Sequence, residues 1–407
     1  MTHLLKLVLL EVFQVKDKVR DLAGKAFLVL ISILLALAVA ETAARVLIGK
    51  NKTDRRSFEP YFASGDVVFA RSRSELVKAK GGPESYGYTK SVGVYFHTPN
   101  TPATVFDRSN FLFEHSHSRY DSHQVDEIAR SKPDSIRIFV VGGSAAQGLG
   151  ASGKDTTWHA ILEGKLREAL NYKDIYVFNA AMGSFVTTQE RIGYDVAVAP
   201  RNPDLTLILN GFNDLYLPVI FGTRPGDPYQ TGLRYYQILN PSTGSWLEER
   251  SYLFHYFYYR LVYKKLTDNT NQTLSDTATA ATLSEGIGNV YNENVQYLIN
   301  RGAKDSPVLV FLQPWRDLAR VANSHRPRSR HYGFYQNTSN RFRDRFKKET
   351  RFVDISSSLS SAEGEMCFVD YVHFNDTGHK IVADVIFPHV LREAERIYSK
   401  KTTSSSR

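Results

Sequence analysis

The sequence predicts an α/β protein built on a mostly parallel sheet of five strands, with helices covering both faces. Short runs of β-branched and aromatic residues recur along the chain, and segments with one apolar helical face separate them. Several of the runs end in glycine or in a polar side chain. Runs that are apolar throughout indicate strands buried on both faces. Their alternation with helices favours a parallel sheet.

The expected strands are residues 136–141, 175–180, 205–214, 308–312 and 351–356. Helices are expected from about residue 158, with Asp155 as the N-cap, from 188 to 198, from 287 to 300, and after Asp376, which would cap the last helix. Residues 218–283 interrupt this alternation. Their aromatic part, 251–266, is interpreted as a helix packing a local core, with a lid, an acyl-binding surface or a membrane-facing helix as alternatives. Residues 267–283 are expected to form a loop.

Composition limits the classes of function. The 407 residues suffice for one large domain with attachments or for two domains, and 42% hydrophobic with 23% charged residues indicates a mostly globular chain. The net charge of +9 is spread along the sequence, so a membrane surface or an acidic polymer suits it better than nucleic acid. The single cysteine, Cys367, excludes an internal disulfide and a thiolate metal cluster.

The N-terminal part contains a long apolar run. Residues 26–40 include one polar residue, Ser32, and the run extends to residue 48 if Glu41 and Arg45 pair one helical turn apart. A full membrane span needs about 20 residues. We interpret residues 26–48 as a transmembrane anchor behind a tail of residues 1–25. A cleaved signal peptide is the alternative, and basic residues on both flanks leave the orientation open.

The remaining boundaries follow from composition. Residues 49–134 are expected to be an irregular juxtamembrane region, in which the histidines of 115–123 are interpreted as a solvated loop in preference to a metal site. Residues 135–400 form the expected α/β domain, with 218–283 as an insertion. Residues 401–407 are expected to be a disordered tail.

Candidate catalytic residues follow the expected strands. Ser144 comes directly after the first strand and two glycines, Gly183 follows the second strand, and Asn213 ends the third. The carboxyl ends of parallel strands share one edge, where ligands bind in open α/β sheets. A serine nucleophile needs a base and donors for the oxyanion. The backbone N–H of Ser144, the N–H of Gly183 and the carboxamide of Asn213 are candidate donors.

The base is expected near the C-terminus. Asp370 and His373 lie three residues apart in a loop before the last helix, so the carboxylate can fix one ring nitrogen while the other faces Ser144.

These blocks, in this order, resemble the SGNH (GDSL-like) hydrolases, and in particular their membrane-anchored bacterial members. The blocks read GGSAAQG, NAAMGSF, NGFND and DYVH. The resemblance implies a flavodoxin-like three-layer α/β/α sandwich with no metal and no other cofactor. It implies that Ser144 is the nucleophile and an oxyanion donor, that Gly183 and Asn213 complete the oxyanion hole, and that Asp370 and His373 complete the triad. Many members have Asp where this chain has Gly143, a difference that bears on the subfamily.

The expected function is that of a membrane-anchored serine esterase, which removes acyl groups, O-acetyl first, from a carbohydrate at the cell envelope through an acyl-enzyme. The expected location is a single-pass membrane protein with its catalytic domain in the periplasm or otherwise outside the cytoplasm. The expected partners are the acylated glycan, the membrane and polysaccharide-biosynthesis proteins. Three alternatives remain open: an O-acetyltransferase of exopolysaccharide modification, a lipid esterase, and a non-catalytic scaffold of polysaccharide assembly.

Overall fold

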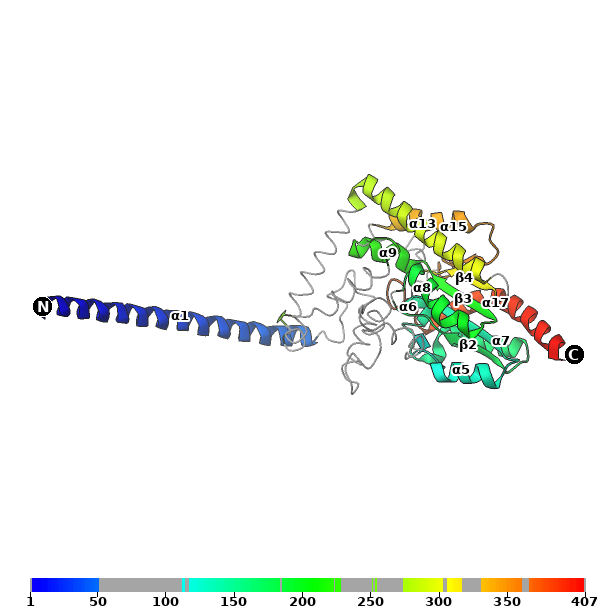
Figure 1. Ribbon diagram of the computed structural model, residues 1–407, viewed down its shortest axis with the longest axis horizontal. Coiled ribbons are helices and arrows are strands. Elements are labelled where there is room, and N and C mark those ends of the chain that lie inside the picture. Colours follow the sequence, from blue (N-terminus) through cyan, green and yellow to red (C-terminus); the bar gives the residue numbers. More distant parts are fainter. Residues whose placement is uncertain are drawn as a thin grey trace. The chain divides into compact units, whose positions relative to one another are not determined.

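The computed structural model describes a large part of the chain (Figure 1). The described residues are 2–50, 112–113, 117–183, 185–222, 224–227, 251, 253–254, 274–302, 306–316, 331–360 and 366–405. In helix α1 (Thr2–Lys50), side chains are described at residue 20 and from 22 to 46. The chain divides into two compact units, one of Met1–Ser57 with Pro241–Val262 and one of Phe58–Asn240 with Tyr263–Arg407.

The second unit is built on a five-stranded parallel sheet with the order β2-β1-β3-β4-β5. The strands are β1 (Ile136–Gly142), β2 (Ile175–Asn179), β3 (Leu205–Asn210), β4 (Val308–Leu312) and β5 (Phe352–Asp354). This is the strand order of flavodoxin-like folds, so the expected fold class is confirmed.

Strand β1 is the central element of this order, because it pairs with β2 on one side and with β3 on the other. Ile138 is in register with Val177 of β2 and with Leu205 of β3. The chain leaves β1 towards β2 and later returns past β1 to β3. The strand order therefore reverses at the carboxyl end of β1, which is the place where such sheets bind ligands.

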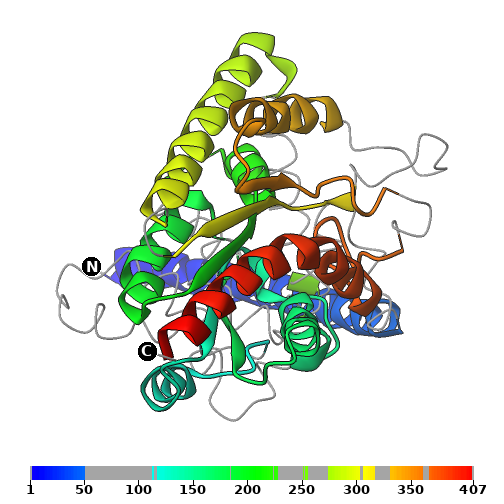
Figure 2. The same ribbon diagram turned by 90° about the vertical axis from the view of Figure 1, so that its right-hand side faces the viewer.

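Helices cover both faces of the sheet. Right-handed crossovers from β1 to β2 and from β2 to β3 run in opposite directions, so α7 (Trp158–Ala169) and α8 (Thr187–Gly193) lie on opposite faces. Helix α17 (Asp376–Ser405) packs beside α7, and Figure 2 shows it in front of the sheet. On the other face, α13 (Thr277–Arg301) packs against α8 and α15 (Tyr332–Phe346).

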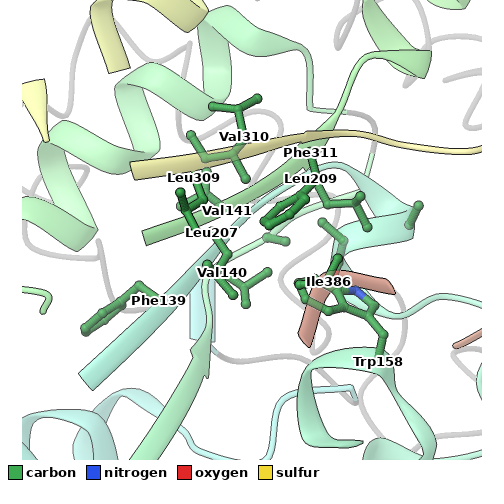
Figure 3. Close-up of a cluster of buried hydrophobic side chains, with 14 of the residues drawn as sticks. Phe139, Val140, Val141, Trp158, Leu207, Leu209, Leu309, Val310, Phe311 and Ile386 are labelled. Atoms are coloured by element: carbon green, nitrogen blue, oxygen red, sulfur yellow. Dashed lines mark hydrogen bonds between the residues drawn. The ribbon is translucent and has the colours of Figure 1, made fainter. Parts of the chain in front are cut away.

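The core lies between the sheet and these helices (Figure 3). Phe139 of β1 is 1% exposed, and its ring lies 5.0 Å from that of Phe178 and 6.1 Å from that of Phe113. On the α7 side, Trp158 is fully buried and its indole N–H donates to the Ala146 carbonyl at 3.1 Å.

Two elements have bounds that differ from those that the sequence predicted. The third strand ends at Asn210, not at residue 214, because Gly211 adopts φ +110° and the chain turns there into α9 (Phe212–Phe221). Residues 277–283, expected in a loop, belong to α13, whose N-cap Asp276 accepts from the N–H groups of Ala278 and Thr279 at 3.3 Å. The cap and the alanine-rich first turns favour a helix despite the threonines.

The two residues expected to be helix N-caps, Asp155 and Asp376, do not have this role. Asp155 does not cap α7; it lies in a 3₁₀ turn and pairs with Arg119 at 3.2 Å. The cap of α17 is Asn375, whose side-chain oxygen accepts from the Gly378 N–H at 3.0 Å. Asp376 is the first residue of the helix, and its carboxylate accepts from the Ser152 N–H.

Two regions expected to lack regular structure contain helix. Residues 122–131 form helix α5 (Ser122–Ser131), which begins with a capping box between Asp121 and Gln124. Residues 401–405 continue α17, and Lys401 ties this part of the helix to the Ser135 carbonyl and to the Asp204 carboxylate, both at 2.9 Å.

The first unit contains α1. Its segment Leu22–Val46 has a mean hydropathy of 2.5, so it is long and apolar enough to cross a membrane. A signal sequence near the N-terminus has the same property. The expected pair of Glu41 and Arg45 is present at 2.8 Å. Glu41 also accepts from the Ser251 hydroxyl at 2.8 Å and from the Leu253 N–H at 3.0 Å. The rest of the aromatic stretch 251–266 lies outside the described residues.

Replacing Phe139 by Ala should lower the free energy of unfolding by about 3–5 kcal/mol, because it removes a ring packed between two others and leaves a cavity. Urea denaturation followed by tryptophan fluorescence measures the change. Arg130→Ala, on the exposed side of α5, is the control and should change stability by less than about 0.5 kcal/mol. Equal stability of the two variants would contradict this packing.

Candidate active site

Ser144 lies at the carboxyl end of β1, as the sequence predicts. It is the first residue of the short helix α6 (Ser144–Gln147) and is 6% exposed. The two preceding glycines are required by close approach. A Cβ on Gly142 would lie 2.4 Å from the Leu209 carbonyl oxygen, and a Cβ on Gly143 would lie 2.5 Å from Nδ2 of Asn213. The turn therefore places the serine against the neighbouring strand β3.

His373 and Asp370 lie beside this serine. Nε2 of His373 is 2.6 Å from the Ser144 hydroxyl oxygen, although the two residues are 229 positions apart. Nδ1 of His373 contacts a carboxylate oxygen of Asp370, and the exposed fractions of the two residues are 4% and 1%. With Nδ1–H donating to the carboxylate, the lone pair of Nε2 faces the serine hydroxyl, as proton abstraction requires.

The loop holds Asp370 in place through its own backbone. The other carboxylate oxygen accepts from the N–H groups of Val372 and His373, both at 2.7 Å. Three hydrogen bonds on one buried carboxylate fix its orientation. The three-residue spacing seen in the sequence is therefore the spacing of a tight turn around the carboxylate.

Asn213 and Gly183, two of the three expected donors, also come to this edge. Asn213 is in the first turn of α9, and its Nδ2 donates to the Phe185 carbonyl at 2.9 Å while it touches Gly143. Gly183 is buried in the loop after β2, which is tied to the end of β1 because the Met182 N–H donates to the Gly142 carbonyl at 3.0 Å.

A contact that the sequence did not reveal joins the two halves of the site. Asp376 accepts from the N–H and from the hydroxyl of Ser152, at 2.8 and 2.6 Å. Gly150, at φ +98°, lies so close to Phe374 that a Cβ would be 2.2 Å from the Phe374 carbonyl oxygen. The segment that follows Ser144 is thereby held against the loop that carries His373. The sequence contained one signal for this contact, the glycine at position 150.

Two buried acids lie behind Asn213. Asp214 accepts from the Thr187 N–H at 3.1 Å and from its hydroxyl at 2.6 Å, so it ties α9 to α8. Burial raises the pKa of Asp214 to about 6, against the opposing effect of these hydrogen bonds. Burial, and then the nearby Asp214 charge, raises the pKa of Glu190, which accepts from the Asn210 carboxamide at 2.6 Å.

The other titratable groups close to the site have packing roles. His379 is fully buried, its Nδ1 accepts from the Trp158 N–H at 3.3 Å, and burial lowers its pKa to about 3. Burial also lowers the pKa of His117. This residue is half-buried, whereas the sequence predicted a solvated loop here. Cys367 is buried. Among the described residues, no group of three or more His, Cys, Asp or Glu side chains is placed to hold a metal ion.

The family comparison agrees with this geometry. The model of the GDSL-like Lipase/Acylhydrolase family matches residues 140–381, which is more than half of the chain and includes all five candidate site residues. The chain belongs to this family and is a carboxylic ester hydrolase of the SGNH type. No curated protein matches the chain.

Three solved structures illustrate the similar proteins. The acetyl xylan esterase AlAXEase is 15% identical over 63% of this chain and 100% of its own, with a TM-score of 0.38. Axe2, an acetylxylan esterase from Geobacillus stearothermophilus, is 15% identical over 64% and 94%, with a TM-score of 0.36. A two-domain esterase active on acetylated mannans is 14% identical over 67% and 53%, with a TM-score of 0.36.

Gly143→Ala should lower kcat for a short ester about as much as Asn213→Ala, by about a hundredfold, because the added Cβ displaces the Asn213 carboxamide. Initial rates with nitrophenyl acetate measure both. The double variant should be little worse than either single one, since both remove the same donor. Gly164→Ala, with nothing near its Cβ, is the control. Full activity of Gly143→Ala would contradict the placement of Asn213.

Asp214 should make stability depend on pH. Its folded-state pKa of about 6 lies above the ordinary 3.8, so its contribution to stability is fully present below pH 3.8 and is lost as the pH rises through 6. Relative to Asp214→Asn, the wild-type free energy of unfolding should fall by about 3 kcal/mol over this window. Urea denaturation at pH 4 and pH 7 measures it. Asp344→Asn, which changes an exposed acid, is the control and should leave the pH dependence of stability as in the wild type. If the stability of the wild type and of Asp214→Asn changed with pH in the same way, the raised pKa of Asp214 would be refuted.

Proposed function

We propose that the Ser144 hydroxyl is the nucleophile of this ester hydrolase, that His373 is its general base and that Asp370 orients His373. The observation that carries the proposal is the 2.6 Å contact between the serine hydroxyl and Nε2 of His373, with the carboxylate on the opposite ring nitrogen. A serine hydroxyl is a weak nucleophile until such a base removes its proton.

The reaction then proceeds in two halves. Ser144 attacks the ester carbonyl, and His373 takes the hydroxyl proton and gives it to the departing alcohol. Water, activated by the same imidazole, then releases the acid from the acyl-enzyme. The oxyanion of each tetrahedral intermediate accepts from the Ser144 N–H, the Gly183 N–H and the Asn213 carboxamide, which are fixed before the substrate arrives.

The proposed substrate is a short-chain ester, acetyl first, on a carbohydrate. The burial of the site supports the short acyl group, because Ser144 and His373 are only 6% and 4% exposed and glycines at 142 and 143 are already needed to avoid clashes. A long acyl chain would have to displace this packing. The carbohydrate part of the proposal comes from the family resemblance of the four sequence blocks.

The proposed location is the cell envelope. The apolar segment Leu22–Val46 supports membrane attachment through α1, with Glu41 and Arg45 near its end. We propose that the segment stays uncleaved as a single span and that the hydrolase unit acts outside the cytoplasm, where acylated envelope glycans are found.

Ser144→Ala should lower hydrolysis of nitrophenyl acetate by at least about a thousandfold, because the nucleophile is lost while the fold is kept. Ser399→Ala on α17, an exposed serine far along the last helix, is the matched control and should keep wild-type activity. Circular dichroism checks that both variants are folded.

Two outcomes would contradict the proposal. Activity retained by Ser144→Ala would assign the chemistry to another group. Acetyl groups appearing on an added glycan, with no free acetate released, would assign the acyl-enzyme to transfer instead of hydrolysis.

A further inference from the structure

Residues 313–316 bridge two parts of the site already described. They follow β4 at the same edge of the sheet as Ser144. At one end, the Gln313 N–H donates to the carbonyl of Asn210, where β3 ends, at 2.9 Å. The Trp315 ring lies 6.1 Å from the ring of Phe212, the neighbour of Asn213.

The other end of this segment supports the loop with the catalytic histidine. The Arg316 N–H donates to the Tyr371 carbonyl at 2.7 Å, and Tyr371 lies between Asp370 and His373. The Arg316 guanidinium carbon lies 4.0 Å from the centroid of the Tyr371 ring. A substrate bound between the oxyanion donors and His373 would therefore lie next to residues 313–316.

Three buried donors in this segment have no acceptor within the described part of the chain. They are Nε2 of Gln313, Nε1 of Trp315 and Nε of Arg316. Gln313 and Trp315 are 3% and 2% exposed. Buried donors are nearly always paired in folded proteins, and each unpaired one is costly. Three of them within four residues, beside an active site, indicate that something with acceptor atoms binds there.

The positive charge of Arg316 limits the chemical class of this ligand. Its guanidinium makes no ion pair with any described carboxylate, and it lies over the Tyr371 ring as a cation–π contact. Indole and guanidinium groups are donors only, so the ligand has to offer oxygen acceptors. A planar guanidinium that lacks a carboxylate partner among the described residues matches a carboxylate better than a neutral hydroxyl.

We propose that Arg316, with Gln313 and Trp315, binds a carboxylate of the substrate, so that the preferred ester is on an acidic glycan in which a uronate residue adjoins the acylated sugar. This inference rests on the proposed function and adds the charge of its substrate.

The test compares three substrates with the full-length chain at low salt. They are an O-acetylated oligouronate, a neutral O-acetylated oligosaccharide of the same length, linkage and acetylation, and nitrophenyl acetate. The wild-type protein should show a kcat/KM about tenfold higher for the acidic than for the neutral glycan, decreasing as salt is added. Arg316→Gln should bring this ratio close to one, and Arg316→Lys should keep part of it.

Arg130→Gln, which removes an equal charge from the exposed side of α5, is the matched control and should keep the wild-type ratio. An equal loss on all three substrates in Arg316→Gln would show that Arg316 only supports the Tyr371 loop, and would overturn the inference. Wild-type hydrolysis of nitrophenyl acetate with no preference for the acidic glycan would overturn the inference and leave the proposed function standing. Failure to hydrolyse any of the three would overturn the proposed function.

Discussion

The constraint on which the site depends is the position of β1 between β2 and β3. Because the strand order reverses at the carboxyl end of β1, the loops after three strands gather there. This brings Ser144 within 2.6 Å of a histidine 229 residues later. Both residues are buried. The residues that they contact come from the ends of buried strands or from the turn before α17. The sheet therefore fixes the positions of Ser144 and His373 relative to each other.

Close packing around the serine is the second requirement, and it explains the Gly-Gly pair. Strand β3 and the Asn213 carboxamide occupy the space that side chains at 142 and 143 would need. Behind this carboxamide, the buried acid Asp214 holds α9 against α8, next to the buried Glu190. Their burial disfavours the charged carboxylates, since it raises both pKa values. On the opposite side, the contact of Asp376 with Ser152 joins the segment after Ser144 to the segment after His373. The site is thus held from two sides by polar contacts within the hydrolase unit.

The sequence predicted the elements whose signals are local, and it missed those that depend on distant partners. The buried strands and the order of the four blocks were enough for the fold class and for placing Ser144, Asp370 and His373 together. The end of the third strand was missed because Gly211 at positive φ interrupts an apolar run without a change in composition. The wrong cap at Asp376 has a non-local origin, since its carboxylate is taken by Ser152, more than 200 positions away in the sequence. The buried donors of residues 313–316 leave no trace in any local pattern.

The most direct test of the account is covalent labelling with a fluorophosphonate, followed by peptide mass spectrometry. This reagent reacts with serines that a neighbouring base activates. The account predicts a single modified residue, Ser144, with labelling lost in His373→Ala and greatly slowed in Asp370→Asn while the fold persists. Labelling of another serine, or undiminished labelling of Ser144 without His373, would contradict it.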